Sequence, residues 1–386
     1  MFRLPRVSSR PGLRHQPNRC RLLNARDTPG HQPARVCTER LCRGTGARRD
    51  RRTDPPVAWR RCVSPDLGQP SSTGIAALSV AVCIATYRRP GGLERLVDGL
   101  GALQFSRSAQ PLLDVIIADN DPQGSAAAPC AELAQTCRWP MVYVVDPRRG
   151  IPYARNAAVC AARERGAELI AFIDDDEVPE PAWLDELLAV MATYQADVVT
   201  GPVLPLFEVE APAWVLRGRF FERPRYQTGV RLDRAYTGNV LLRARVLDTL
   251  SGPFDERKAL SGGTDTHLFL QVADAGHRIV WADGAVVHEW NPPSRLTARW
   301  LVRRAFRASS NWSSSERELR ASLPVRVARI AKAFGRMAQG MILLPLGLLA
   351  GRHLLVRSLR CLAMGAGSLA GLVGREYDEY RVTHGS

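Results

Sequence analysis

Three consecutive aspartates, Asp174, Asp175 and Asp176, directly follow the apolar run 169–173 (LIAFI). A continuous apolar run of this length is typical of a strand buried on both faces, as in a parallel sheet. Open α/β sheets bind ligands at the carboxyl ends of such strands, which is where these side chains would lie. Because neighbouring carboxylates repel one another, the cluster favours a divalent cation shared with a diphosphate. The alternative is a solvated acidic turn before the helix expected near Pro181.

Segments with strand and helix periodicity alternate from Leu78 onward. The predicted strands are 78–85, 113–118, 141–145, 169–173, 197–203, 238–242 and 278–282, and the predicted helices are 93–103, 126–137, 151–165, 183–194 and 266–275. This alternation predicts an α/β fold with a mostly parallel, Rossmann-like sheet and helices on both faces. Polar clusters follow the first, second and fourth strands, so they share one edge of the sheet and border a crevice of nucleotide size. No G-x-G-x-x-G or Walker sequence follows the first strand, which argues against dinucleotide and P-loop sites.

The net charge of +15 is concentrated near the N-terminus. Residues 1–77 hold 16 arginines, no lysine and 5 acids, a net +11, so the remaining residues carry only +4. This stretch is rich in Arg, Pro and Gly without apolar periodicity, which predicts a disordered tail. The same composition would be expected of a gene start assigned too far upstream. Because the rest of the chain is nearly neutral, nucleic-acid binding would depend on the tail alone, and we expect no nucleic-acid partner.

The C-terminal region, 295–386, is basic and amphipathic and then apolar. Its apolar segments 341–350 and 361–373 are both shorter than the about 20 residues needed to span a bilayer. We predict helices that lie on an anionic membrane surface, and the alternative is helices that pack against the preceding domain. The first residues lack the apolar core of a secretory signal, and the nine cysteines lack C-x-x-C spacing. The chain is therefore expected to be cytoplasmic, peripheral on the inner face of the cell membrane.

Four motifs occur in order within residues 78–290: 85–89 (ATYRR), 118–120 (ADN), 154–156 (ARN) and 172–176 (FIDDD). Together they resemble family 2 glycosyltransferases of the GT-A fold, with most similarity to bacterial exopolysaccharide enzymes of the succinoglycan type. The resemblance implies a GT-A domain over 78–294 that transfers a hexose-type sugar with inversion. It also implies a nucleotide-sugar donor, most often a UDP-sugar, and a saccharide or lipid-linked acceptor.

The resemblance implies donor-binding roles for residues in the first three motifs. Thr86, Tyr87 and Arg88 would border the base and the ribose, and Asp119 would accept hydrogen bonds from the base. Arg155 would face the diphosphate, where a guanidinium fork suits phosphate oxygens. The alternative for Arg155 is a solvated arginine on a helix.

The fourth motif implies the metal site. Asp174 and Asp176 match the two acids of the family's D-x-D signature, and Asp175, at the variable position, would join Asp174 in binding the donor. Asp176 would be the more direct ligand of Mg²⁺ or Mn²⁺, which would neutralise the departing nucleoside diphosphate. His288, in VVHEW, falls where GT-A enzymes often place a third metal ligand, although a structural histidine at a strand end is the alternative.

The segment 262–269 (GGTDTHLF) resembles the family block G-G-E-D-x-D-L-F. Asp265 holds the position of the catalytic base, which would remove the proton from the acceptor hydroxyl. A helix N-cap is the alternative for Asp265, and both can hold together. Thr264 and His267 depart from the block, which leaves a non-catalytic family homologue as an alternative.

Asn239, in TGN, and Trp290 are the candidate contacts to the acceptor. The segment 295–300 (RLTARW) is one residue longer than the Q/R-x-x-R-W signature of processive synthases, so we predict that a single sugar is added. A nucleotidyltransferase, which also uses paired carboxylates and a metal, is the alternative enzyme class. Such an enzyme usually carries a Gly-rich basic first loop, which 86–90 lacks.

Overall fold

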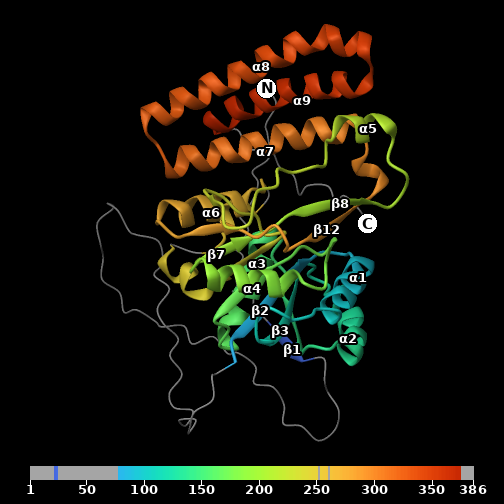
Figure 1. Ribbon diagram of the computed structural model, residues 1–386, viewed down its shortest axis with the longest axis vertical. Helices are drawn as coiled ribbons and strands as arrows, with labels where there is room; N and C mark the ends of the chain where they lie inside the picture. The colour runs from blue at the N-terminus through green and yellow to red at the C-terminus, as the bar shows by residue number, and fades with distance from the viewer. Residues whose placement is uncertain (1–20, 25–76, 251–252, 260, 375–386) are drawn as a thin grey trace, which may run out of the picture.

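Two sheets and a layer of three long helices form the protein in the computed structural model, which describes residues 21–24, 77–250, 253–259 and 261–374 (Figure 1). The larger sheet has the strand order β1-β4-β3-β2-β5-β10-β7-β11-β9. Its strands are β1 (Arg21–Asn24), β2 (Ser79–Thr86), β3 (Leu112–Asp119), β4 (Met141–Val145), β5 (Leu169–Phe172), β7 (Val198–Thr200), β9 (Arg231–Leu232), β10 (Val240–Arg243) and β11 (Ile279–Trp281). The elements predicted between residues 78 and 194 are all present.

The larger sheet is mostly parallel, as predicted. Strands β2 to β5 pair in parallel, whereas β10 runs antiparallel to both of its neighbours, β5 and β7. Residues 21–24 of the predicted disordered tail differ from that prediction, because they form β1 and pair antiparallel with β4, the strand that would otherwise end the sheet. Apart from Ala77, the rest of that tail lies outside the described residues.

Helices cover both faces of the larger sheet, because side chains alternate along each strand. Val80, Val82 and Ile84 of β2 face one side, where α1 (Pro90–Gly101), α2 (Ala127–Thr136) and α4 (Trp183–Thr193) pack. Ala81 and Cys83 face the other side, where α3 (Ile151–Glu164), α6 (Thr264–Asp274) and the 3₁₀ turn η1 (Ala244–Thr249) pack. These two apolar layers hold the carboxyl ends of β2, β3 and β5 in fixed positions.

The smaller sheet has the order β6-β12-β8 and begins directly after the three aspartates. Its strands are β6 (Glu177–Pro179), β12 (Val287–Asn291) and β8 (Val203–Phe207). The single strand predicted over 197–203 is in fact two strands, β7 and β8, which belong to different sheets. Gly201 separates them at a point where a side chain would collide with the backbone oxygen of Ala285, so the chain can turn closely there.

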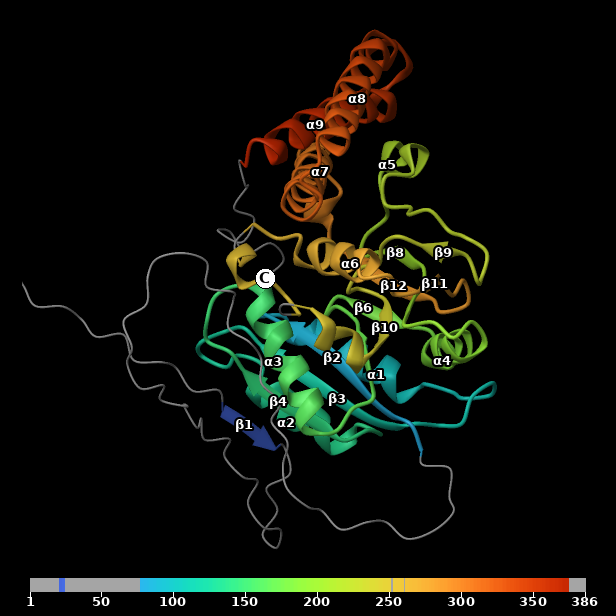
Figure 2. The same ribbon diagram turned by 90° about the vertical axis from the view of Figure 1, so that its left-hand side faces the viewer.

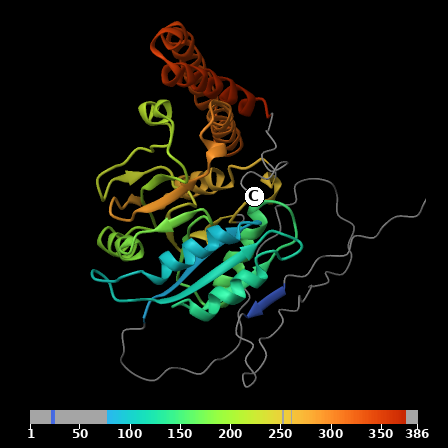
Figure 3. The ribbon, with the colours of Figure 1, turned by 90° about the vertical axis from the view of Figure 1, so that its right-hand side faces the viewer.

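The C-terminal region forms α7 (Ala298–Leu319), α8 (Leu323–Ala350) and α9 (Arg352–Leu372). Helix α9 packs against both α7 and α8, and the α8/α9 pair stands away from the sheets with α7 in between (Figures 2 and 3). The apolar segment 341–350 does not form a helix of its own, because the basic 323–340 and the apolar 341–350 continue as one helix through Pro345. Within the described residues, α8 is the one helix long and apolar enough to cross a membrane.

Candidate functional site

A cavity of about 320 Å³ lies at the carboxyl ends of β2, β3 and β5, where the polar clusters were predicted to gather. We call it the first cavity. Residues that follow these three strands line it together with residues of α3, β12 and α7: Thr86, Tyr87, Arg89, Asn120, Arg149, Ile151, Asp174, Asp175, Asp176, Glu289, Arg295, Trp300, Arg304 and Arg307. Its walls therefore come from both sheets and from the C-terminal helices.

The first two aspartates of the acidic turn have different partners. Asp174 accepts a hydrogen bond at 3.0 Å from Arg155 of α3, the guanidinium expected near the diphosphate. Asp175 is buried, accepts a hydrogen bond from the Thr86 hydroxyl at 2.9 Å and lies 3.1 Å from a guanidinium nitrogen of Arg89. Burial raises the pKa of Asp175 to about 7, although the charge of Arg89 opposes that shift. Burial in this turn thus destabilises the ionised form of Asp175.

Asp176, the third member, lies between two guanidinium groups. Its Oδ2 is 3.2 Å from Arg89 and 2.7 Å from Arg295. Burial raises the pKa of Asp174, and the charge of Asp176 raises it further. Closely spaced carboxylates whose repulsion is only partly offset are the ligands that a hard divalent cation prefers. Asp174 and Asp176 therefore fit Mg²⁺ or Mn²⁺, whereas Asp175 is turned toward Thr86.

A second cavity, of about 490 Å³, adjoins the first. The two cavities share Ile151, Asp174, Glu289 and Arg304 in their walls. Asp265 lines the second cavity from the first turn of α6, and its Oδ1 accepts a hydrogen bond from the backbone of Thr266 at 2.7 Å. Asp265 and the acidic turn thus face adjoining spaces.

Glu177 and Arg223 also line the second cavity, and sequence reasoning missed both. Glu177 is buried, and one of its oxygens accepts a hydrogen bond from the backbone nitrogen of Asp174 at 2.9 Å. Burial raises its pKa well above the ordinary value. Arg223 lies 3.1 Å from Glu289 of β12. Neither residue belongs to a recognisable motif, so only the folded chain brings them to the cavity.

The predicted roles of His288 and Trp290 are not supported by their positions. Glu289 lines both cavities, so its neighbours on β12 point to the opposite face of that strand. His288 Nε2 lies 3.0 Å from Glu180, and the Trp290 ring lies 4.9 Å from the guanidinium of Arg95 on α1. His288 thus points away from Asp174 and Asp176, and Trp290 is absent from the linings of both cavities.

Asn239, the other predicted acceptor contact, is buried in the core. Its side-chain oxygen accepts a hydrogen bond from Trp183 at 2.8 Å, and its amide nitrogen donates to the carbonyl oxygens of Pro202 and Ala285 at 3.0 and 2.7 Å. These partners lie on α4, in the turn between β7 and β8, and in the segment before β12. Asn239 therefore has a structural role, which its sequence motif did not distinguish from an acceptor role.

Asp119 is likewise buried, although it was predicted to contact the base. Its oxygens accept hydrogen bonds from the Tyr143 hydroxyl and the backbone nitrogens of Asp121 and Ala126, all between 2.8 and 2.9 Å. It therefore fixes the loop between β3 and α2. The neighbouring Asn120 lines the first cavity instead, held by a hydrogen bond from the backbone nitrogen of Gly150 at 2.8 Å.

The residues after β2 divide between the cavity and the surface. Tyr87 lines the first cavity, whereas Arg88 adopts a positive φ of 56° and donates to Asp121 at 2.9 Å. The Arg89 side chain points toward the three aspartates and lines the cavity. Arg89 therefore faces the site, whereas Arg88 does not. Two consecutive arginines in a turn cannot be told apart by sequence, because the backbone conformation decides which one points inward.

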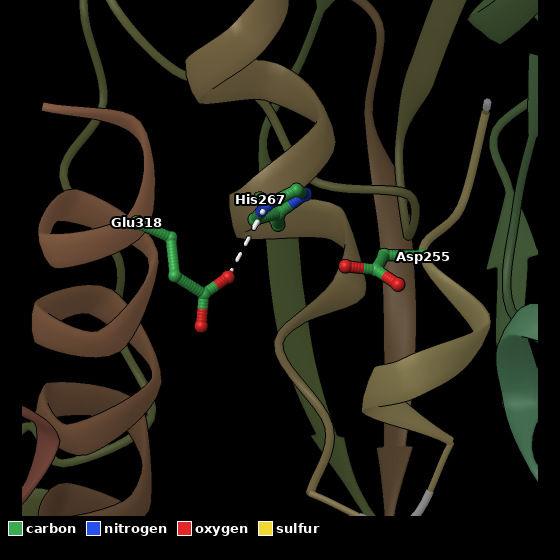
Figure 4. A group of neighbouring side chains, drawn as sticks. All are labelled: Asp255, His267 and Glu318. Atoms are coloured by element: carbon green, nitrogen blue, oxygen red, sulfur yellow. Dashed lines mark ion pairs between the residues drawn. The ribbon is translucent and has the colours of Figure 1, made fainter. Parts of the chain in front are cut away.

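A separate group of side chains joins η2 (Glu256–Lys258), α6 and α7 (Figure 4). Ligand atoms of Asp255, His267 and Glu318 lie within 4.8 Å of one another. Lys258 already lies 3.0 Å from Glu318, and Arg257 lies 2.7 Å from Asp255, so both carboxylates have cationic partners. Burial lowers the pKa of His267, and the charge of Lys258 adds to this effect. The group is therefore an ion-pair network that ties α7 to the sheet domain.

Comparisons with known proteins agree with this geometry. Residues 81–250 match the model of glycosyl transferase family 2. The chain is 34% identical over 231 residues to the succinoglycan biosynthesis protein ExoM of Rhizobium meliloti (strain 1021), which is 60% of this chain and 73% of that protein. It is 21% identical over 207 residues to the glycosyltransferase AglE of Haloferax volcanii, which is 54% of this chain and 65% of that protein.

Among solved structures, the mannosyltransferase PcManGT of Pyrobaculum calidifontis, in complex with GDP-Man and Mn²⁺, has a TM-score of 0.53 and 16% identity. The similarity covers 78% of this chain and 89% of that one, and at this identity it supports the fold. The matched segment 81–250 contains the acidic turn and the strands that position it, and ExoM extends the likeness over most of its own length. The chain therefore belongs to the family 2 glycosyltransferases and has the GT-A fold predicted from its motifs.

Proposed function

We propose that this enzyme transfers one sugar, with inversion, from a nucleotide sugar bound in the first cavity to an acceptor bound in the second. The observation that carries the proposal is the meeting of the two cavities at Asp174, with Asp176 on one side and Asp265 on the other. Two substrates that react directly need adjoining sites with the reacting atoms in contact.

The first cavity suits the donor. Tyr87 and Asn120 offer an aromatic face and a polar edge to the base and ribose, and Thr86 and Asp175, hydrogen-bonded to each other, also line this cavity. Asp174 and Asp176 would hold Mg²⁺ or Mn²⁺, which supplies positive charge to the leaving diphosphate when bound. A UDP-sugar is the donor that the family resemblance favours, and PcManGT was solved with GDP-Man.

The second cavity suits the acceptor and the base. The acceptor hydroxyl oxygen attacks the anomeric carbon while its proton passes to the carboxylate of Asp265. The bond between the anomeric carbon and the diphosphate oxygen breaks, and its electron pair leaves with the nucleoside diphosphate. A single displacement of this kind inverts the anomeric centre, because the nucleophile enters opposite the leaving group.

The test is the Asp265→Asn variant, with Asp274→Asn at the other end of α6 as the matched control. Loss of the base should lower kcat by about 10²- to 10⁴-fold without changing the melting temperature. The control, whose carboxylate pairs with Arg320 at the surface, should keep wild-type turnover. If Asp265→Asn retained full turnover, another group would have to accept the proton.

We also propose that the acceptor is a saccharide, free or lipid-linked, of exopolysaccharide synthesis at the inner face of the cell membrane. The relative ExoM is described as a succinoglycan biosynthesis protein, which supports a saccharide acceptor of exopolysaccharide synthesis. The exposed surface of α8 supports the proposed location at the membrane, because large apolar side chains recur along this helix: Leu323, Val327, Ile330, Phe334, Met341, Ile342, Leu346, Leu348 and Leu349. Helix α9 covers the other side of α8, which favours a helix lying in the interface.

A further inference from the structure

Helix α7 presents three of its side chains to the first cavity at helical spacing. Trp300, Arg304 and Arg307 are four and three residues apart, so they lie on one face of the helix. Arg304 also lines the second cavity, so it stands at the junction where the two spaces meet. Sequence reasoning did not single out Arg304, because arginines are frequent throughout α7.

The start of α7 is fixed by packing, so Arg304 is held in place. The Thr297 hydroxyl accepts a hydrogen bond from the backbone nitrogen of Trp300 at 3.2 Å and caps the helix. The Trp300 ring stacks on Phe221 at a centroid distance of 5.8 Å and an interplanar angle of 9°. Leu301 is buried in the same apolar cluster. A side chain one turn further along is therefore preorganised toward the junction.

The carboxylates at this junction already have cationic partners. Asp174 pairs with Arg155, Asp175 and Asp176 with Arg89, and Glu289 with Arg223 and Arg295. Arg304, in contrast, makes no hydrogen bond or ion pair within the described part of the chain, and its guanidinium instead lies 5.0 Å from the centre of the Trp300 ring. The site thus contains a guanidinium whose donors are available to a ligand.

The surroundings of Arg304 are positively charged, and its side chain is half-buried. Burial lowers the pKa of Arg304 to about 10, and although Glu289 opposes this shift, Arg223, Arg295 and Arg307 add to it. Clustered like charges in a poorly solvated site are costly until an anion joins them. The geometry and the charge therefore both call for an anionic ligand at this position.

We propose that Arg304 binds a phosphoryl oxyanion of a substrate at the junction of the two cavities. Its planar fork can donate two parallel hydrogen bonds to phosphate oxygens. The inference rests on the proposed function, under which two sources supply this chemistry: the diphosphate of the donor and a phosphate on a lipid-linked acceptor. In either case the binding site is complete only with α7, a helix outside the predicted transferase domain 78–294.

The experiment measures binding of two probes to the full chain by titration calorimetry. Inorganic pyrophosphate represents the donor diphosphate, and decyl phosphate, below its micelle concentration, represents a lipid phosphate. The variants are Arg304→Met and Arg304→Lys, with Arg303→Met, an exposed neighbour on α7, as the matched control. Melting temperatures show whether each variant is folded.

Arg304→Met should weaken the binding of one of the two probes by about tenfold or more, because a charge-assisted bidentate contact is lost. Arg304→Lys should recover part of that loss, and Arg303→Met should match the wild type. Weaker binding of pyrophosphate identifies the donor diphosphate as the ligand, and weaker binding of decyl phosphate identifies the acceptor. Unchanged binding of both probes in folded Arg304→Met and Arg304→Lys would overturn the inference. These titrations need no turnover, so they fail or succeed independently of the proposed transfer reaction.

Discussion

At the scale of single residues, the site is organised by pairing between arginines and acids. The acidic turn carries three carboxylates in sequence, and guanidinium groups from the turn before α1, from α3 and from η3 (Pro293–Arg295) approach them. Arg89 of the turn before α1 contacts both Asp175 and Asp176, so it bridges two of the three charges. Two of these carboxylates, Asp174 and Asp176, are those that a divalent cation would need.

A prediction at this scale concerns His267 in the ion-pair network. Its folded pKa is lowered by burial, so between that value and the ordinary value of about 6.5 the unfolded chain binds more protons than the folded one. The free energy of unfolding should therefore rise with pH across this window and fall on acidification. The test is to measure the free energy of unfolding of the wild type and of His267→Gln by urea denaturation between about pH 5 and 8, the range over which histidine titrates. The difference between the two proteins should shrink toward low pH, and a constant difference would contradict the prediction.

At the scale of elements, the turn between β5 and β6 depends on a close approach by the chain before β10. An ideal Cβ on Gly238 would lie 2.5 Å from an oxygen of Glu177, the residue that accepts a hydrogen bond from the backbone of Asp174. The absence of a side chain at Gly238 thus allows Glu177 to hold the acidic turn in place.

Gly238→Ala should therefore lower the free energy of unfolding by about 1–3 kcal/mol, because the core must shift to admit the methyl group. Gly91→Ala is the matched control, since a Cβ there meets nothing within 4 Å and alanine is the better helix former. Denaturant unfolding of both variants measures the difference. Equal stability of Gly238→Ala and the wild type would show that Glu177 moves without cost.

Elements with strong periodicity were predictable, whereas the directions of single side chains were not. The boundaries of β4 were predicted to the residue, and those of α3 and β5 to within one residue, because apolar runs and turn residues define them. His288 and Trp290 lie on β12, which was not among the predicted strands, and they face away from the cavity, since a one-residue difference reverses the face. Arg295, Arg304 and Glu289 were missed because long-range packing brings them to the acidic turn.

At the scale of the whole molecule, the three C-terminal helices differ in their surroundings. Helix α7 contributes side chains to the first cavity, whereas α8 lies beyond α9 (Figure 1) and exposes large apolar side chains. An enzyme held on a membrane through α8 would keep its cavities open to the aqueous phase while remaining near a lipid-linked acceptor.

Replacing Ile342 and Leu349 by glutamate should weaken binding to vesicles that contain anionic phosphatidylglycerol. Each side chain buried in the interface contributes about 1.5–3 kcal/mol, so a loss of at least tenfold per residue is expected. Leu349 is 88% exposed. The control is Leu112→Glu at the start of β3, where the leucine is 64% exposed, and this variant should bind vesicles like the wild type. Co-sedimentation with vesicles measures the effect, and undiminished binding of the double variant would exclude α8 as the membrane-binding element.

The most direct test of the account is release of nucleoside diphosphate from a panel of nucleotide sugars by the full chain, with and without Mn²⁺. Asp176→Ala removes a proposed cation ligand, and Asp233→Ala removes a surface carboxylate that pairs with Arg234. We expect Mn²⁺-dependent release from one donor by the wild type and Asp233→Ala, and none above background by Asp176→Ala. Release of pyrophosphate instead, or the absence of both release and binding with every donor, would contradict it.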